Sequence, residues 1–148
     1  MRAVIQRVLQ ARVEIQGRTA GEIGRGLLVY ASVGKADTPQ DVQYIADKIT
    51  GLRIFADEAG KMNLSVKDVK GGVLLISNFT LHSDCRKGRR PGFDAASEPQ
   101  AAEQLYDKLI ESVAASGIDV QKGVFGAHMH VSSINDGSVT FILESRRT

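Results

Sequence analysis

The chain has 148 residues, of which 19 are Lys or Arg and 17 are Asp or Glu, so its formal charge is +2. Hydrophobic residues make up 43% and charged residues 24% of the chain, which is typical of globular proteins and excludes disordered, collagen-like and coiled-coil chains. No apolar run approaches the ~20 residues of a membrane-spanning helix, and the start of the chain lacks the apolar core of a signal peptide. We therefore expect one cytoplasmic domain over residues 1–148 with no membrane partner, in which the single cysteine, Cys85, stays reduced.

The first third of the sequence has the alternation of β-strands. Apolar residues alternate at Ala3 and Ile5 and again at Val13 and Ile15, and residues 27–33 form the nearly continuous apolar run of a strand buried on both faces. Related patterns predict further strands over residues 53–56, 72–77, 119–125, 128–134 and 139–144. Between the last two strands, the segment 135–138 contains an Asp-Gly pair that tolerates positive φ, so we expect a tight hairpin turn there.

Two segments have helical spacing instead. Thr38 followed by Pro39 is a typical N-cap with a proline at the first helical position, and apolar residues follow at helical intervals as far as Leu52. A second helix is expected to begin at residues 97–99 and to stop at Gly117. About eight strands and two helices in one unbroken chain predict an α+β fold, a sheet or barrel with the helices packed on it.

Residues 77–85 contain the densest set of reactive side chains. If the strand continues past Ser77, then Thr80, His82 and Asp84 share one face and suggest a hydroxyl, imidazole and carboxylate triad. Neighbours on one strand face are ~6.6 Å apart, however, and triads usually draw their members from separate elements. We therefore favour the simpler interpretation, a strand that ends in a polar loop.

Two histidines, His128 and His130, share one face of a predicted strand, where a third ligand from residues 82–85 could complete a metal site. The sequence has no CxxC or HExxH motif to support such a site. It also lacks the glycine-rich phosphate cradles of nucleotide-binding proteins. We therefore expect no metal and no cofactor.

A basic run places Arg86, Lys87, Arg89 and Arg90 within five residues. Because the whole chain carries only +2, this concentration leaves the rest slightly acidic. Phosphate is the natural partner of such a cluster, and a solvated loop without a ligand is the alternative.

Seven segments along the whole chain resemble one family, the D-aminoacyl-tRNA deacylases. They are residues 1–8, 21–24, 52–55, 60–65, 77–81, 86–91 and 135–141. The resemblance implies a homodimeric, β-barrel-like fold with two packed helices. It also implies hydrolysis of the ester that joins a D-amino acid to the terminal adenosine of tRNA, a proofreading activity, with misattached glycine as a further candidate substrate.

The first motif of this family, Ser-Gln-Phe-Thr, resembles Ser77, Asn78, Phe79 and Thr80, where Asn78 stands in place of Gln. The resemblance implies that backbone N–H groups around Phe79 and the hydroxyls of Ser77 and Thr80 surround the ester carbonyl and the terminal ribose. Such donors stabilise an oxyanion without an acid or a base of their own. The nucleophile is then either the Thr80 hydroxyl or water assisted by the ribose 2′-hydroxyl. We favour the water, because only His82 lies near enough in sequence to activate Thr80, and the resembled family does not keep a histidine at that position.

The second motif, Asn-x-Gly-Pro-Val-Thr, resembles the segment with Asn135, Gly137 and Ser138, where Ser138 stands in place of Pro. The resemblance implies that this pair faces the active site of a partner subunit and that a cis bond aims both carbonyls at the α-amino group of the substrate. A cis bond before a non-proline residue costs ~2.5–4 kcal/mol, so we expect a trans bond and weaker rejection of L-substrates, unless neighbouring contacts hold it cis. Arg7 resembles the arginine that braces these carbonyls. Met129 resembles a pocket-lining residue, with a core position as the alternative.

Deacylation of D-aminoacyl-tRNA is therefore the function that we predict, with tRNA bound by the basic run and no DNA partner expected. One alternative is a paralogue with relaxed stereospecificity that acts on L-aminoacyl-tRNA. A second alternative is a nucleic-acid-binding protein of the same fold without catalysis. The intact Ser77, Phe79 and Thr80 argue against the second alternative.

Overall fold

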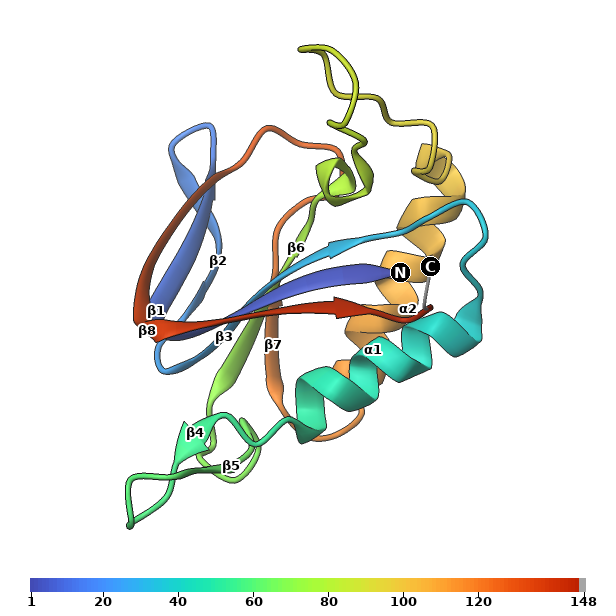
Figure 1. The fold of residues 1–148 in the computed structure, drawn as a ribbon. Helices are drawn as coiled ribbons and strands as arrows, with labels where there is room; N and C mark the ends of the chain where they lie inside the picture. The colour runs from blue at the N-terminus through green and yellow to red at the C-terminus, as the bar shows by residue number, and fades with distance from the viewer. Residues whose placement is uncertain (147–148) are drawn as a thin grey trace.

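The computed structural model describes residues 1–146, so the predicted domain of residues 1–148 extends two residues beyond the described part. A six-stranded sheet forms the centre of the molecule, in the order β2-β1-β3-β6-β7 with β8 paired to the other side of β1 (Figure 1). Its strands are β1 (Arg2–Ile15), β2 (Arg18–Ile23), β3 (Gly26–Ser32), β6 (Gly72–Ser77), β7 (Asp119–Lys122) and β8 (His130–Glu144). The remaining elements are α1 (Pro39–Gly51), α2 (Pro99–Ala114), the two-stranded β4 (Phe55–Ala56) and β5 (Met62–Leu64), and the 3₁₀ turn η1 (Phe79–His82).

Two long strands give the sheet its curvature. β8 pairs antiparallel with β1 along nearly its whole length, from the pair Arg2–Glu144 to the pair Glu14–His130. β1 also pairs with β3 through its first half and with β2 through its second half, so the sheet bends around β1 into a nearly closed barrel (Figure 1). This arrangement, with two helices beside it, confirms the predicted α+β, barrel-like fold class.

The core occupies both faces of the central strands. β3 and β6 run parallel, and alternate residues of β3 point to opposite sides: Leu27 and Val29 face the helices, whereas Leu28 faces the inside of the curved sheet. α1 and α2 cover the first face together, and each side chain buried there contributes ~1.5–3 kcal/mol. Residues 27–32 are thus a strand buried on both faces, as the apolar run predicts.

The two helices lie where the sequence predicts them. α1 follows Thr38, whose backbone N–H donates to the Asp41 carboxylate at 2.8 Å, and α2 ends three residues before Gly117. The predicted strand over residues 53–56 is shorter in the structure, since only Phe55 and Ala56 pair with β5. No helix within residues 1–146 is long and apolar enough to cross a membrane.

The predicted hairpin at residues 135–138 is wrong. Residues 130–135 and 140–144 both pair with β1 in the same direction, and the residues between them bulge opposite Arg7, so β8 is one interrupted strand. The Asn135 side-chain amide holds the bulge by donating to the carbonyls of Arg7 at 2.9 Å and Val139 at 3.2 Å. The Gly137–Ser138 bond is cis, so the expected trans bond is also wrong.

Candidate active site

A cavity of about 930 Å³ opens where the parallel strands β3 and β6 end. Residues 30–33 and 76–79 form one side of it, because parallel strands bring their carboxyl ends to the same edge of a sheet. Residues 93–98, just before α2, and residues 125–129, just before β8, supply the other walls. Four segments that are far apart in sequence therefore meet around one hollow.

The first motif lies at this cavity. Ser77 ends β6, the Asn78 N–H donates to the Ala31 carbonyl at 2.8 Å, and the chain then turns into η1. Ser77, Asn78 and Phe79 line the cavity, whereas Thr80 is exposed next to it and donates its hydroxyl to Asn78 Oδ1 at 2.5 Å. All four predicted catalytic residues therefore gather at one strand end.

The first two N–H groups of η1 are free to bind a ligand. Throughout residues 1–146, no protein group accepts a hydrogen bond from the N–H of Phe79 or Thr80, although the following N–H of Leu81 donates to the Asn78 carbonyl at 3.3 Å. Two adjacent free N–H groups at the rim of a cavity can stabilise a developing negative charge on oxygen.

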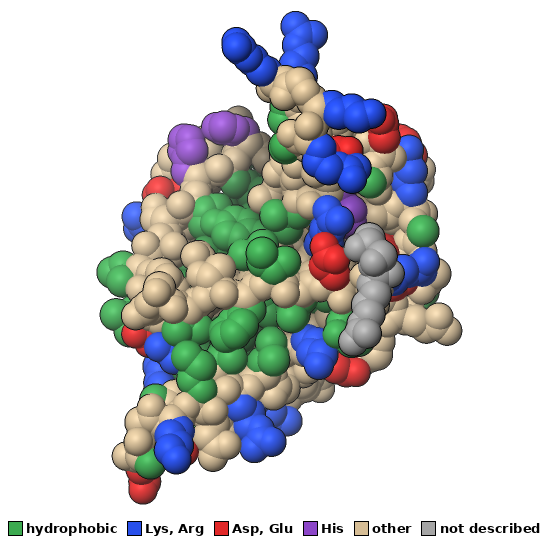
Figure 2. Space-filling model, viewed as in Figure 1, with side chains coloured by type: hydrophobic (Ala, Val, Ile, Leu, Met, Phe, Trp, Pro, Cys, Tyr) green, Lys and Arg blue, Asp and Glu red, His purple; other side chains and the backbone are tan. Residues whose placement is uncertain are grey.

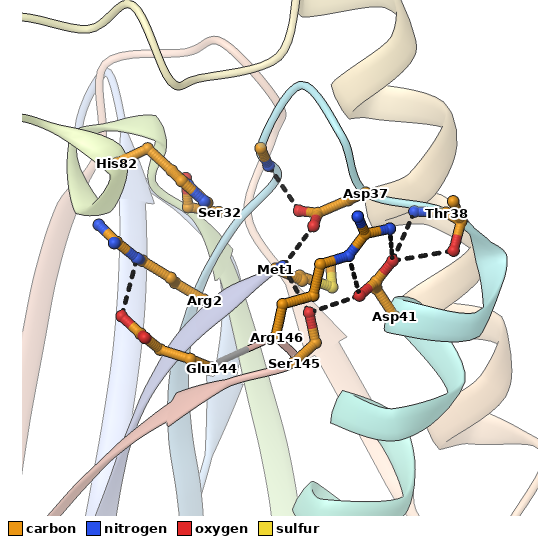
Figure 3. Close-up of polar contacts among 11 residues, drawn as sticks. Met1, Arg2, Ser32, Asp37, Thr38, Asp41, His82, Glu144, Ser145 and Arg146 are labelled. Atoms are coloured by element: carbon orange, nitrogen blue, oxygen red, sulfur yellow. Dashed lines mark hydrogen bonds and ion pairs between the residues drawn. The ribbon is translucent and has the colours of Figure 1, made fainter. Parts of the chain in front are cut away.

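The triad of Thr80, His82 and Asp84 does not form, because β6 ends at Ser77 and the strand alternation stops there. His82 is buried, and its Nδ1 lies 2.6 Å from Ser32 Oγ (Figure 3). Asp84 pairs with Arg86 instead. Burial, together with the nearby Arg2 guanidinium, lowers the pKa of His82, so the imidazole is neutral at pH 7 and engaged with Ser32.

Sequence reasoning missed several residues of this site. Ser32 is a buried hydroxyl in an apolar strand, Phe93 packs against Phe79 with ring centroids 5.1 Å apart, and the Tyr106 hydroxyl donates to the Leu75 carbonyl at 2.8 Å. Burial raises the pKa of Tyr106. A lone serine within the apolar run 27–33 is the signal that could have identified Ser32. An aromatic residue three positions after the last cation of the basic run is the signal for Phe93.

The second motif lies apart from this cavity. Arg7 donates from Nε to the Asp136 carbonyl at 3.0 Å and from Nη1 to the Ile54 carbonyl at 2.7 Å, so it contacts the carbonyl before Gly137 rather than those of Gly137 and Ser138. None of the described residues that line the cavity belongs to the segment 135–138.

The segment before β8 supplies Met129 and His128 to the cavity wall. A Cβ atom on Gly123 would lie 2.5 Å from the Met129 sulfur, so any other residue there would displace this side chain. The rings of His128 and His130 meet edge to face with centroids 5.1 Å apart. Within the described part of the chain, no three His, Cys, Asp or Glu side chains are grouped as metal ligands.

The basic run forms a projecting loop, the basic arm, which comprises residues 84–92 (Figures 1 and 2). Asp84 and Gly92 close its base with two backbone hydrogen bonds of 2.8 and 2.9 Å. Arg86 pairs with the Asp84 carboxylate through Nε at 2.8 Å and Nη2 at 2.7 Å, and this pairing lowers the pKa of Asp84. Among the described ion pairs the other three cations of the arm have no acidic partner, so three charges remain available rather than four.

Comparisons with known proteins agree on one family. The family model described as D-Tyr-tRNA(Tyr) deacylase matches residues 4–144. A protein of Thermotoga petrophila named D-aminoacyl-tRNA deacylase is 52% identical over 147 residues and covers 99% of both chains. A protein of Geobacter sulfurreducens with the same name is 52% identical over 146 residues and covers 99% of this chain and 96% of its own.

Two solved structures are also similar. One, described as c-Myc DNA Unwinding Element Binding Protein, has a TM-score of 0.93 and 37% identity, with 99% of this chain and 100% of the other covered. The other, described as a probable eukaryotic D-amino acid tRNA deacylase, has a TM-score of 0.84 at 16% identity, covers 96% of this chain and 97% of its own, and supports the fold alone.

Proposed function

The chain belongs to the D-Tyr-tRNA(Tyr) deacylase family, and on this premise we propose that it hydrolyses the ester of D-aminoacyl-tRNA, releasing a D-amino acid and free tRNA. The observation that carries the proposal is the 52% identity to a protein named D-aminoacyl-tRNA deacylase over 99% of both chains. The activity is a chiral proofreading step of translation, for which we propose a cytoplasmic location and a single domain.

We propose that the reaction takes place at the rim of the cavity, beside Ser77, Asn78 and Phe79. Attack on the ester carbonyl places negative charge on its oxygen, and the free N–H groups of Phe79 and Thr80 stabilise that charge. The bond between the carbonyl carbon and the ribose oxygen then breaks, and the ribose oxygen takes up a proton. The Ser77 hydroxyl, which lies at the same rim, binds the substrate next to the ester.

The nucleophile in this proposal is water assisted by the ribose 2′-hydroxyl of the substrate. Two contacts argue against attack by Thr80. Its hydroxyl already donates to Asn78 Oδ1, an amide oxygen that takes up no proton, and the Nδ1 of His82 is engaged with the Ser32 hydroxyl. Attack by Thr80 therefore has no base to support it.

We further propose that the active protein is a homodimer that forms through exposed apolar side chains of β1 and β8. Large apolar side chains are exposed there, among them Ile142 at 75%, Leu9 at 52% and Ile134 at 48%. Figure 2 shows hydrophobic side chains gathered on the face that β8 crosses. The segment with Asn135, Gly137 and Ser138 lies on the same strand, so in this proposal it belongs to the surface that meets the partner.

Ile142→Glu tests this interface, because a charge in an apolar interface opposes association. We expect the variant to be a monomer by light scattering, with the fold retained by circular dichroism. A dimer that survives the substitution places the interface elsewhere.

Binding of nucleic acid without catalysis is the second candidate function. The similarity to a protein described as a DNA-unwinding-element binding protein favours it, as does the basic arm. We propose tRNA as the ligand of Arg86, Lys87, Arg89 and Arg90, with Arg86 contributing least because Asp84 pairs with it.

A deacylation assay separates the two functions. We expect rapid hydrolysis of D-tyrosyl-tRNA and little hydrolysis of L-tyrosyl-tRNA, with no loss after chelation. Binding of tRNA without hydrolysis of either ester supports the second function instead.

A second experiment tests the nucleophile. A substrate that ends in 2′-deoxyadenosine should lower the rate of hydrolysis more than Thr80→Ala does, because this substrate lacks the assisting hydroxyl. An ester trapped on Thr80 contradicts the proposed nucleophile.

A further inference from the structure

Two phenylalanines meet on the surface at the mouth of the cavity. The rings of Phe79 and Phe93 lie edge to face, with centroids 5.1 Å apart and planes inclined by 61°. Phe79 is 58% exposed and Phe93 40% exposed, and neither belongs to the two core clusters of buried side chains. Scattered exposed apolar residues are common, but two aromatic rings in contact at a cavity mouth indicate a surface that receives a ligand.

The basic arm connects these two rings. Phe79 lies in η1 before the arm, and Phe93 follows Gly92, where two backbone hydrogen bonds close the base of the arm. The arm therefore rises beside the aromatic pair with Lys87, Arg89 and Arg90 exposed. Adjacent cations and exposed rings suit a ligand that carries both phosphates and flat apolar faces.

Unpaired nucleotides have this chemistry. In a duplex the base faces are stacked and hidden, whereas a single strand presents them to aromatic side chains and its phosphates to cations. In an edge-to-face pair, one ring keeps both faces clear of its partner and the other keeps one face clear. The geometry of Phe79 and Phe93 thus leaves a ring face open for stacking.

We propose that Phe79 and Phe93 form a stacking platform for one base of the single-stranded 3′ end of tRNA, the base that precedes the terminal adenosine. The ester and its adenosine occupy the cavity rim, and the cations of the arm neutralise the adjoining phosphates. This inference rests on the proposed function, because it takes the strand to be the end that carries the ester. A hydrophobic wall for the amino-acid side chain is the competing role for these rings.

The test uses two variants of Phe93 and a matched control. Phe93→Leu keeps an apolar side chain and removes the ring, whereas Phe93→Tyr keeps the ring. Tyr44→Leu is the control, since Tyr44 is an aromatic residue of α1 that is 42% exposed and does not line the cavity. The substrates are D-tyrosyl-tRNA and the same tRNA with an abasic penultimate nucleotide. Melting temperatures show whether each variant is folded, and Phe79→Leu replaces Phe93→Leu if that variant is not.

We expect Phe93→Leu to lower kcat/KM on intact tRNA about ten-fold, while Phe93→Tyr and Tyr44→Leu stay near the wild type. The abasic substrate should lower kcat/KM of the wild type by a similar factor, and Phe93→Leu should cause no further loss on it. Equal losses from Phe93→Leu on both substrates would contradict the stacking platform and favour a hydrophobic wall for the amino-acid side chain. No loss on either substrate would contradict it too and would mean that the two rings bind no part of the substrate. If the wild type hydrolyses neither substrate, the proposed function itself fails.

Discussion

Two charged regions of this molecule use the same residue types in opposite ways. Beside the start of α1, Asp41 is buried and accepts hydrogen bonds from Arg146, Ser145 and Thr38 (Figure 3). In the basic arm, Lys87 and Arg89 are exposed and have no ion pair among the described contacts. Charges that already have partners stabilise the fold, whereas exposed charges without partners can exchange their counterions for a polyanion.

The largest effect is expected at Asp41. Asp41→Asn should lower the free energy of unfolding by about 2 kcal/mol, because it removes the charge that pairs with Arg146 and replaces one of the two acceptor oxygens with an NH2 group. Urea denaturation measures this change. Asp47→Asn, on the exposed side of the same helix, is the matched control and should cost under ~0.5 kcal/mol. Equal costs at both positions would remove the distinction between the two regions.

Acid should expose the same difference. Hydrogen bonds, first from Arg146 and then from Ser145 and Thr38, hold the pKa of Asp41 well below its usual value. Its contribution is therefore complete above the unfolded pKa of ~3.9 and is lost as the pH falls further. Between pH 7 and pH 3, the unfolding free energy should fall less in Asp41→Asn than in the wild type or in Asp47→Asn. An equal fall of the unfolding free energy in all three proteins would contradict the stabilising role of the ionised Asp41.

The basic arm should respond to salt rather than to denaturant. In the double variant Lys87→Ala and Arg89→Ala, the slope of log affinity for tRNA against log salt should be less steep by roughly 1.4, or about 0.7 per phosphate contact. The free energy of unfolding should be unchanged. The matched pair Lys67→Ala and Lys108→Ala removes two exposed cations elsewhere and should leave the slope as it is. An unchanged slope in the arm variant would mean that the arm is a solvated loop that contacts no phosphate.

The smallest change should come from breaking the ion pair between Asp84 and Arg86 in the arm. Asp84→Asn releases Arg86, while the backbone hydrogen bonds between residues 84 and 92 remain. The salt slope should then steepen by roughly 0.7 as a fourth cation becomes available. Arg86→Ala in the wild type should leave the slope nearly unchanged. A loss of affinity in Asp84→Asn would mean that the carboxylate holds the arm in its binding conformation.

Features set by neighbouring residues could be predicted from the sequence, and those set by distant pairing could not. The helix after Thr38 depends on its own cap and spacing, and the apolar run from residue 27 is buried on both faces. The Asp136–Gly137 pair gives the local signal of a turn, but pairing with β1 on both sides of it keeps β8 continuous. Such pairing spans more than a hundred residues and leaves no local pattern.

The site shows the same division. Its first motif could be located by resemblance, and Ser77 to Phe79 do line the cavity. The strand alternation that suggested a triad fails because the chain turns into η1 directly after β6, and this turn sends His82 toward Ser32. The contact between Phe79 and Phe93 depends on the closure of the basic arm between them, which no spacing rule predicts.

The pairing of β1 with β8 also sets the order in which the chain can fold during synthesis. β1 finds β2 and β3 within the first 32 residues, but its other edge stays open until β8 has been made roughly 130 residues after β1. At ~5–20 residues per second, the ribosome needs about 6 to 26 s to supply that strand. Throughout this interval the nascent chain presents a long, unpaired strand edge, which is a template for aggregation with other copies. Final closure of the sheet is therefore a late event, after most of the chain has left the ribosome.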